Sequence, residues 1–418
     1  MKRGILMTSS TLTLDARTIE VVKSTVPVLA QHGEAITKRF YEMMFANHPE
    51  LLNVFNHANQ KQGKQPRALA NTVYAAAQYI DNLEAIVPVV KQIAHKHRSL
   101  EIKADQYPIV GKHLLLAIKD VLGDAATDEI IDAWGKAYGV IADVFIQVEK
   151  EMYEEAAAMN GGWNGFRDFV IDKKVKESDV ITSFYLVAKD GKAISSFQPG
   201  QYISVRCKIE GEKYTHIRQY SLSDAPGKDY YRISVKREEG AEQIPGGVAS
   251  NYLHEHIDEG DVIEVTAPAG DFVLDMNSQE PVVLISGGVG LTPMISMLNT
   301  IVEKQPERNA TFVHAAINGK THAMHDGVKA VAASCENVQY FVCYEKPTEE
   351  DRMKGEFDKE GYVDKEWLET VIGENMNGTF YFCGPVPFMK SVNQSLKDLG
   401  IASEKVHFEF FGPADQLN

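Results

Sequence analysis

The chain has 418 residues, too many for one hydrophobic core, and this length predicts two or three domains of roughly 100 to 150 residues each. Its 44% hydrophobic and 24% charged residues are typical of an ordinary globular protein. The formal net charge of -15 argues against nucleic acid or anionic lipid as a partner, because both bind basic surfaces. We therefore expect small diffusing substrates and no stable membrane association. We also expect a monomer.

The four cysteines, Cys207, Cys335, Cys343 and Cys383, form no CxxC or CxxCH pair. This spacing disfavours iron–sulfur clusters, structural zinc and covalently attached haem, and a reducing cytoplasm is the expected location. Residues 1–10 contain too short an apolar run for a secretory signal. The longest apolar stretch, 281–298, is interrupted by three glycines and a second proline, so it predicts a strand, a turn and a helix.

Residues 15–158 show helical periodicity almost throughout. Ile86, Val90, Ile93 and His97 trace one helical face at spacings of four, three and four residues, which predicts an all-α domain. The stretch 156–162 ends in a glycine pair, where a long helix would stop. We place the first domain boundary in this stretch.

From residue 165 to about 275 the hydrophobic period changes to two. Ile203, Val205, Cys207 and Ile209 alternate with polar residues, and short strands with Pro and Gly turns predict a small antiparallel β-barrel. Beyond Pro281, apolar runs alternate with helical patterns, which predicts an α/β domain with a parallel sheet. The expected domains are 13–158, 163–276 and 280–418.

A glycine-rich turn, Gly287-Gly288-Val289-Gly290, follows the predicted strand 282–286. Thr292 is expected to cap the next helix and Pro293 to lie in its first turn. Glycines let backbone N–H groups approach a pyrophosphate at the positive end of a helix, as a dinucleotide site requires. Alone, the turn is about as well explained by a purely structural role.

The tetrad Arg218-Gln219-Tyr220-Ser221 combines a guanidinium, an aromatic plane and a hydroxyl on one predicted strand. Alternation places Arg218 and Tyr220 on one face and Ser221 on the other, so the strand could wrap the edge of a flavin. An ordinary barrel strand is the alternative if the tetrad is considered without its neighbours.

With Pro199-Gly200-Gln201-Tyr202 before the tetrad and the segment 247–251 after it, the order of motifs resembles the ferredoxin-NADP reductase-like family. The resemblance implies an FAD site made by Tyr202, Arg218, Gln219, Tyr220, Ser221 and Ser250. It implies a nicotinamide nucleotide site made by Gly288, Val289, Gly290, Leu291, Thr292, Pro293, Cys383, Gly384 and Pro385. Residues 314–318 lack a Ser/Arg pair for a 2'-phosphate, which favours NADH while leaving NADPH possible.

His95, His97 and His113 are the candidate haem ligands of the helical half. His97 follows Ile93 on the apolar face, whereas His95 lies on the polar face. His113 also follows apolar residues, so the pattern does not exclude it. From pattern alone, a structural core histidine is the more frequent explanation for His97 and for His113.

The motifs Asn47-His-Pro-Glu50, Lys96-His97, Gln106-Tyr107 and Asp132-Ala-Trp-Gly-Lys-Ala-Tyr138 resemble the globin domain of flavohaemoglobins. The resemblance covers nearly all of the chain from residue 14 onward, and residues 1–13, with Met7 as an alternative start, precede it. It implies haem b with His97 as the iron ligand, oriented by Tyr107 and Glu149. It also implies a distal pocket, two charges that tune the potentials of haem and flavin, and a C-terminal segment that closes over the flavin. The distal residues are Tyr41, Gln65, Phe55 and Leu69, the tuning charges are Lys96 and Glu409, and the closing segment is Glu409, Phe410, Phe411, Gly412 and Pro413.

Taken together, the resemblances imply a nitric oxide dioxygenase in which NADH reduces FAD, FAD reduces haem, and dioxygen converts nitric oxide to nitrate. One alternative is a globin that binds or senses oxygen and uses the reductase only to keep its iron ferrous. Another is a haem-free flavin reductase whose helical domain docks an electron carrier.

Overall fold

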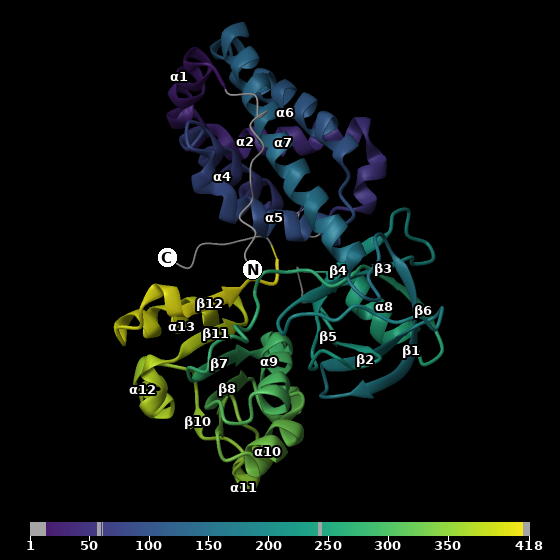
Figure 1. The fold of residues 1–418 in the computed structure, drawn as a ribbon, viewed down its shortest axis with the longest axis vertical. Coiled ribbons are helices and arrows are strands. Elements are labelled where there is room, and N and C mark those ends of the chain that lie inside the picture. The colour runs from purple at the N-terminus through teal and green to yellow at the C-terminus, as the bar shows by residue number, and fades with distance from the viewer. Residues whose placement is uncertain (1–13, 57–59, 61, 241–244, 413–418) are drawn as a thin grey trace. The chain divides into compact units, whose positions relative to one another are not determined.

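The protein is described here by a computed structural model, and the described residues are 14–56, 60, 62–240 and 245–412. The expectations about the start of the chain and about Pro413 lie outside them. The chain forms two compact units (Figure 1). The first runs up to Glu155 and includes Lys213–Thr215, and the second contains Ala156–Glu212 and everything from His216 onward.

The first unit is all-α, as the periodicity predicts. Prolines near the starts of α2, α5 and α6 suit positions where a backbone N–H has no helical partner. The last helix ends at Ala158, before Gly161 adopts a left-handed φ of 71°. The helices are α1 (Ala16–Ser24), α2 (Val26–Asn47), α4 (Lys64–Gln78), α5 (Val87–Ser99), α6 (Tyr107–Leu122) and α7 (Asp128–Ala158), with short 3-10 turns η1 (Pro49–Asn53), η2 (Leu83–Ile86), η3 (Ala104–Gln106) and η4 (Gly123–Ala125).

Two apolar clusters hold the helical unit together. The larger joins α2 to α4, α6 and α7 through buried side chains such as Ile36, Phe40 and Trp134. The smaller joins α5 to α7 through Val90 and Phe145 among others. Because Val90 and His97 lie two helical turns apart, the packing that buries Val90 also turns His97 toward α7.

The second unit begins with a six-stranded antiparallel sheet in the order β4-β3-β6-β1-β2-β5. An isolated bridge between Leu222 and Ile233 joins the segment after β4 to β5, so the two outer strands meet, as a barrel requires. Its elements are β1 (Arg167–Lys176), β2 (Ile181–Ala188), β3 (Tyr202–Cys207), β4 (His216–Ser221), β5 (Tyr231–Lys236), α8 (Val248–His256) and β6 (Val262–Val265).

A six-stranded parallel sheet in the order β10-β9-β8-β7-β11-β12 follows. Its strands are β7 (Val282–Gly287), β8 (Ala310–Ala316), β9 (Val338–Tyr344), β10 (Lys359–Glu360), β11 (Thr379–Cys383) and β12 (Val406–Glu409). Its helices are α9 (Leu291–Lys304), α10 (His325–Ser334), α11 (Glu349–Lys354), α12 (Lys365–Ile372) and α13 (Val386–Asp398), with the turns η5 (Gly288–Gly290), η6 (Gly319–Thr321), η7 (Gly373–Asn377) and η8 (Ser403–Lys405).

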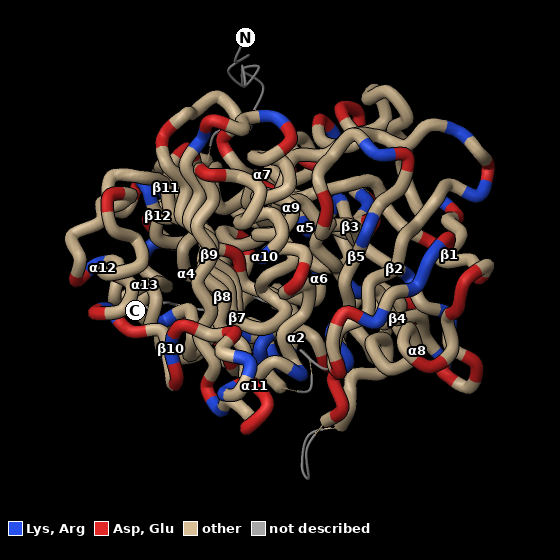
Figure 2. The backbone as a smooth tube through the Cα atoms, turned by 90° about the horizontal axis from the view of Figure 1, so that it is seen from below, with Lys and Arg blue, Asp and Glu red and all other residues tan. Residues whose placement is uncertain are grey.

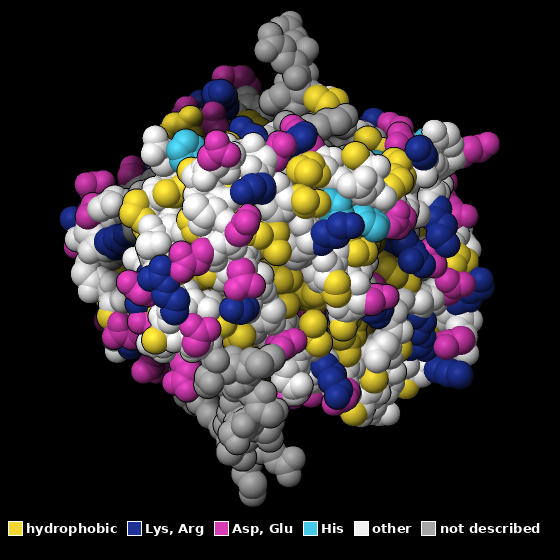
Figure 3. Space-filling model, turned by 90° about the horizontal axis from the view of Figure 1, so that it is seen from above, with side chains coloured by type: hydrophobic (Ala, Val, Ile, Leu, Met, Phe, Trp, Pro, Cys, Tyr) yellow, Lys and Arg dark blue, Asp and Glu magenta, His cyan; other side chains and the backbone are white. Residues whose placement is uncertain are grey.

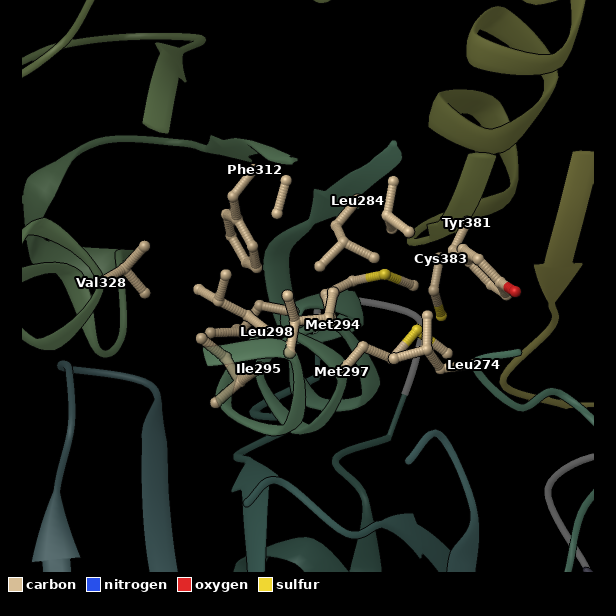
Figure 4. Close-up of a cluster of buried hydrophobic side chains, with 14 of the residues drawn as sticks. Leu274, Leu284, Met294, Ile295, Met297, Leu298, Phe312, Val328, Tyr381 and Cys383 are labelled. Atoms are coloured by element: carbon tan, nitrogen blue, oxygen red, sulfur yellow. The ribbon is translucent and has the colours of Figure 1, made fainter. Parts of the chain in front are cut away.

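Both faces of the parallel sheet are covered. Leu284 on β7 packs toward α9, as Figure 4 shows, whereas Val283 and Ile285 pack toward α12 and α13. This alternation explains why β7 reads as a continuous apolar run in the sequence. Since β8 and β11 lie on opposite sides of β7, the chain reverses its direction across the sheet at the carboxyl ends of β7 and β11. Open α/β sheets bind ligands at such a point.

Two local expectations are wrong. Ile209 does not extend the period of β3, because the strand ends at Cys207 and residues 209–212 form a turn in which Gly211 has a φ of 86°. Thr292 does not cap α9, because the helix begins at Leu291 with Gly290 as its N-cap. The Thr292 hydroxyl instead donates to the carbonyl of Val289 at 3.1 Å.

The surface carries charges of both signs. Acidic and basic positions are scattered over strands, helices and loops in Figure 2, and the face shown in Figure 3 mixes both with scattered apolar side chains. The net charge of -15 therefore reflects a surplus of carboxylates spread among basic residues.

Three histidines of the α/β domain form a row, in which His314 and His322 are buried and His325 is half-buried. The rings of His314 and His322 have centroids 4.5 Å apart, and those of His322 and His325 are 4.6 Å apart. Tyr340 and Tyr344 bond the two nitrogens of His322 at 2.8 and 2.9 Å. Burial lowers the pKa of all three histidines, that of His314 to about 3. The folded domain therefore favours their neutral forms.

We expect this row to make the domain sensitive to acid. An unfolded histidine binds a proton near its ordinary pKa of about 6.5 while the folded row does not, so the free energy of unfolding decreases as the pH falls from about 6.5 toward 3. Each histidine contributes a loss of roughly 1.4 kcal/mol per pH unit between its unfolded pKa and its lower folded pKa. Urea midpoints between pH 7 and 5 should show a shallower slope in His325→Asn. The matched variant His256→Asn, on an exposed side chain of α8, should keep the original slope, and equal slopes in both variants would contradict the assignment.

Candidate functional site

A carboxylate, an imidazole and a phenol meet inside the helical unit. His97 on α5 places its Nδ1 atom 2.7 Å from Glu149 Oε1 on α7. The Tyr107 hydroxyl, at the start of α6, donates to the same oxygen at 2.6 Å and lies 3.2 Å from His97 Nδ1. Glu149 is only 3% exposed. The Glu149 carboxylate is therefore buried rather than solvated, and its hydrogen bonds to His97 and Tyr107 offset the cost of burial.

This geometry determines the protonation of His97. A carboxylate acceptor keeps the proton on Nδ1, which leaves Nε2 as the nitrogen available to bind a metal and makes that nitrogen more basic. Burial, followed by the charge of Glu149, raises the pKa of Tyr107, so the phenol stays a hydrogen-bond donor. The donor set fits a haem iron bound through Nε2.

The structure also separates the three histidine candidates. His113 is 1% exposed, its Nδ1 bonds the Ile109 carbonyl at 2.8 Å, and its Nε2 lies 3.0 Å from the Asn47 side-chain nitrogen. Because both ring nitrogens are engaged, His113 is a structural histidine. His95 precedes His97 by two residues, about 200° around α5, and so faces a different side of the helix.

The predicted distal residues lie on α2, on α4 and just before it. The Tyr41 ring is 6% exposed and packs against Phe45 and Phe55, with ring centroids 5.7 Å away in each case. Leu69 and the half-buried Gln65 lie on α4, which packs on α2. Burial raises the pKa of Tyr41, and the Gln65 side chain acts against that shift. Tyr41 is thus a protonated phenol in an apolar wall.

The predicted flavin motifs come together in the barrel. In the β3–β4 register Tyr202 lies opposite Ser221, so the two motifs share one pair of strands. Burial lowers the pKa of Arg218, and no carboxylate forms an ion pair with this guanidinium in the described part of the chain. Ser250 lies in the first turn of α8, a helix that packs beside β4. A half-buried arginine on a strand beside this helix fits a pyrophosphate.

The predicted nucleotide motifs meet at the reversal point of the parallel sheet. Cys383 pairs with Ser286 in the β11–β7 register, which brings Cys383-Gly384 beside the glycine turn. A Cβ atom on Gly290 would lie 2.2 Å from the Cys383 carbonyl oxygen, so only glycine allows this approach. Pro385 is the N-cap of α13, and Val289 packs at the edge of the core.

The closing segment runs along the same edge. Glu409 pairs with Cys383 in the β11–β12 register, and burial, with the Glu409 charge, raises the pKa of the Cys383 thiol. Phe410 is half-buried, and Phe411 is 49% exposed beside Gly412, the last described residue. An exposed aromatic ring next to a nucleotide edge is available to cover a ligand.

Sequence reasoning missed two polar connections near these motifs. Ser286 Oγ bonds His314 Nδ1 at 2.8 Å directly behind the glycine turn. Asp224, three residues after Ser221, bonds side chains of α9. Neither connection has a local pattern, because each joins residues from different elements.

Comparisons with known proteins agree with this arrangement. The globin family model matches residues 38–145, the oxidoreductase FAD-binding domain matches 168–274 and the oxidoreductase NAD-binding domain matches 284–394. A flavohemoprotein of Bacillus thuringiensis subsp. konkukian is 64% identical over 404 residues, which are 97% of this chain and 100% of that protein. The chain belongs to the flavohemoprotein family. It therefore has the haem-, FAD- and NAD-binding domains of an oxidoreductase of this family.

Comparison with solved structures also supports membership of the flavohemoprotein family. A flavohemoglobin of Malassezia yamatoensis with bound FAD and heme matches with a TM-score of 0.81 at 26% identity, covering 96% of this chain and 100% of that one. The FAD/NAD-binding domain of a nitric oxide dioxygenase from Vibrio cholerae matches with a TM-score of 0.53 at 38% identity, covering 59% of this chain and 99% of that one. Among the described residues, no helix is long and apolar enough to cross a membrane.

The close approach at Gly290 generates one prediction. In Gly290→Ala the new methyl group would force the turn away from Cys383, an overpacking that costs about 1–3 kcal/mol. We expect the KM for NADH, measured with ferricyanide as acceptor, to rise by roughly ten- to a hundredfold. Gly327→Ala, in α10 with open space around its Cβ position, is the matched control. An unchanged KM in Gly290→Ala would remove the turn from the site.

A second prediction concerns the hydrogen bond between Glu149 and His97. Glu149→Gln keeps the shape but removes the negative charge of the carboxylate that accepts from the imidazole, so the iron–histidine stretching frequency of the ferrous protein should fall in resonance Raman spectra. Haem-dependent NADH oxidation should decrease by about tenfold or more, the range for residues that orient a metal-binding histidine. Glu154→Gln, on an exposed position of α7, should leave both unchanged. Identical spectra for the two variants would mean that Glu149 does not act on the iron ligand.

Proposed function

We propose that the chain is a nitric oxide dioxygenase that passes electrons from NADH through FAD to haem and uses dioxygen to convert nitric oxide to nitrate. The observation that carries the proposal is the buried Glu149 carboxylate bonded to His97. A charged acceptor on an iron ligand increases electron donation to the iron, which favours chemistry on dioxygen over simple storage. The name of the Vibrio cholerae relative supports the same activity.

When bound, haem supplies the iron for the gas chemistry and FAD converts a two-electron hydride donor into a source of single electrons. His97 would hold the iron through Nε2. Tyr202, Arg218, Gln219, Tyr220, Ser221 and Ser250 would hold FAD, and Gly288, Val289, Gly290, Leu291, Thr292, Pro293, Cys383, Gly384 and Pro385 would hold the nucleotide. Lys96 and Glu409 would adjust the two potentials, and the segment from Glu409 to Pro413 would close over the flavin.

Tyr41 is proposed to act on the gas. Its ring is buried against Phe45 and Phe55, its hydroxyl interacts with the side chains of Gln65 and Gln60, and its raised pKa keeps the proton on the oxygen at neutral pH. A phenol in such surroundings donates a strong hydrogen bond, because no bulk water competes for it. Gln65 is proposed to orient that hydroxyl from α4.

Several narrower proposals accompany this function. We propose the domain boundaries 13–158, 163–276 and 280–418, a monomeric protein and no nucleic acid or membrane partner. NADH is proposed over NADPH, because β8 ends in Ala316 and is followed by Ile317 and Asn318, which offer no cation for a 2'-phosphate. The four cysteines are free thiols, which supports a cytoplasmic location.

The direct test is nitric oxide consumption by the purified holoprotein, followed with an electrode in the presence of NADH and oxygen. We expect rapid catalytic consumption with nitrate as product, and a rate lower by about 10² in Tyr41→Phe, the usual cost of removing one donor from a reacting site. The control Tyr79→Phe changes an exposed phenol and should retain the full rate.

Other outcomes would replace the proposal. A single stoichiometric reaction without turnover would indicate an oxygen-binding or sensing globin. Purified protein with flavin but no Soret band, even after haem is supplied, would indicate a haem-free reductase. A Tyr41→Phe variant with the full rate would remove Tyr41 from the chemistry while leaving the activity itself established.

A further inference from the structure

Helix α9 carries one polar stripe on an otherwise buried surface. Of residues 291–301, only Asn299 is not fully buried, because the helix lies between the parallel sheet and the barrel. Ser296, Asn299 and Glu303 follow one another at spacings of three and four, so they share one face of the helix. This face meets the loop that follows β4.

Asp224 is the centre of that contact. Its backbone carbonyl accepts a hydrogen bond from Ser296 Oγ at 2.8 Å, and its Oδ1 accepts one from the Asn299 side-chain nitrogen at 2.8 Å. One turn further along α9, Lys228 Nζ lies 2.6 Å from Glu303 Oε1. One loop of the barrel is therefore bonded to α9 over two helical turns.

The barrel holds the Asp224 carboxylate from the other side. Tyr230 donates to its Oδ2 at 2.9 Å, and Arg232 Nη1 lies 3.8 Å from the same atom. The Asp224 side chain is 13% exposed. Burial acts to raise the pKa of Asp224, but the charge of Arg232 and the hydrogen bonds hold it below its ordinary value. The carboxylate is ionised, and its oxygens have fixed partners.

The position of this contact along the chain gives it significance. Asp224 lies three residues after Ser221, the end of the proposed flavin strand, and Ser296 lies six residues after Gly290, in the proposed nucleotide turn. A helix and a short packed loop deform little, because their backbones are hydrogen-bonded or packed, so a displacement at one end reaches the other. A shift of α9 therefore moves the nucleotide turn relative to the flavin strand.

The remaining contacts of α9 with the barrel are mainly apolar. Leu274 shares the cluster of Met294 and Met297 (Figure 4). Phe272 belongs to the same cluster, and a Cβ atom on Gly200 would lie 2.8 Å from Met297 Cε. Apolar contacts stabilise an interface without defining one register, because dispersion and burial have no preferred direction. Hydrogen bonds to Asp224 do define one, since they weaken beyond about 3.2 Å.

We propose that Asp224 is a positioning residue for hydride transfer, because it fixes α9 and the nucleotide turn against the flavin strand. The inference rests on the proposed route from NADH to FAD and is independent of which gas the haem handles. Reacting atoms must lie about 3–3.5 Å apart with the correct orientation. A misplacement of about 1 Å can lower the reaction rate by about 10²-fold. Loss of the bond to Asn299 should therefore slow the transfer more than it weakens binding.

The test is anaerobic reduction of the FAD in the full-length holoprotein by NADH, followed by stopped-flow absorbance. In Asn299→Ala we expect the limiting rate to fall by roughly tenfold, with the Kd for NADH changed by less than about twofold. The limiting rate should fall further in Asp224→Ala. In Asp224→Asn, which keeps an acceptor at Oδ1, it should return most of the way to the wild-type value. Asp229→Ala in the same loop and Lys304→Ala on α9, both exposed, are the matched controls.

Two readouts separate positioning from a loss of structure. The flavin midpoint potential and the thermal unfolding temperature should stay at their wild-type values in Asn299→Ala. Without nucleotide, hydrogen exchange should increase in the segments 221–230 and 288–304, where the contact holds the backbone. The control variants should show wild-type exchange in both segments.

An unchanged limiting rate in Asn299→Ala and Asp224→Ala would overturn the proposal. So would a rate that falls only together with flavin loss or with the unfolding temperature, because Asp224 would then be purely structural. An Asp224→Asn variant no faster than Asp224→Ala would also overturn it. Failure of the wild-type protein to consume nitric oxide would refute the proposed function but leave the NADH-to-FAD reaction, and this test, intact.

Discussion

The enclosure of helix α9 is the constraint on which the reductase half of the structure depends. The helix is buried in one apolar cluster that contains side chains of β7 and β8 and of the barrel domain, so it cannot tilt or slide without opening that cluster (Figure 4). Its first residues continue directly from the glycine turn. Because a packed interior tolerates little displacement, the turn inherits the rigidity of the helix.

That rigidity explains why a polar contact was kept in an apolar interface. Apolar packing holds the barrel and the α/β domain together, and the bonds of Asp224 select one register from the many that packing alone would permit. The glycine at position 290 serves the same end from the other side, because it allows the turn to touch β11 directly. Both features favour an accurate distance between two cofactor sites over additional stability.

In the helical unit, a buried charge fixes the orientation of a side chain. Glu149 is costly to bury, and its burial is tolerated because His97 and Tyr107 both supply hydrogen-bond donors. The same bonds hold the imidazole in one tautomer and one orientation. Here a carboxylate that would lower stability if it were unpaired instead orients the histidine that we propose as the iron ligand.

By itself, the sequence determined the three architectures and the location of the motifs. Periods of 3.6 and two residues are local properties, and they predicted the all-α unit, the antiparallel barrel and the parallel sheet that the structure contains. The motifs around Arg218, Gly288 and Cys383 were also recognisable, because each depends on residues close together in the chain. His97 was one of three candidates: the pattern placed His95 on the polar face, and only the family resemblance favoured His97 over His113.

Only the tertiary structure decided between those histidines. Pattern alone could not exclude His113, and the structure shows both of its nitrogens engaged by residues from α2 and α6. Likewise, Glu149 is buried because α5 packs on α7, and Asp224 meets α9 across more than 70 residues of chain. The capping role expected for Thr292 failed for a related reason, since the strand before it and the packed helix set where α9 begins. Hydrogen bonds between distant elements leave no period in a sequence, so only the folded chain reveals them.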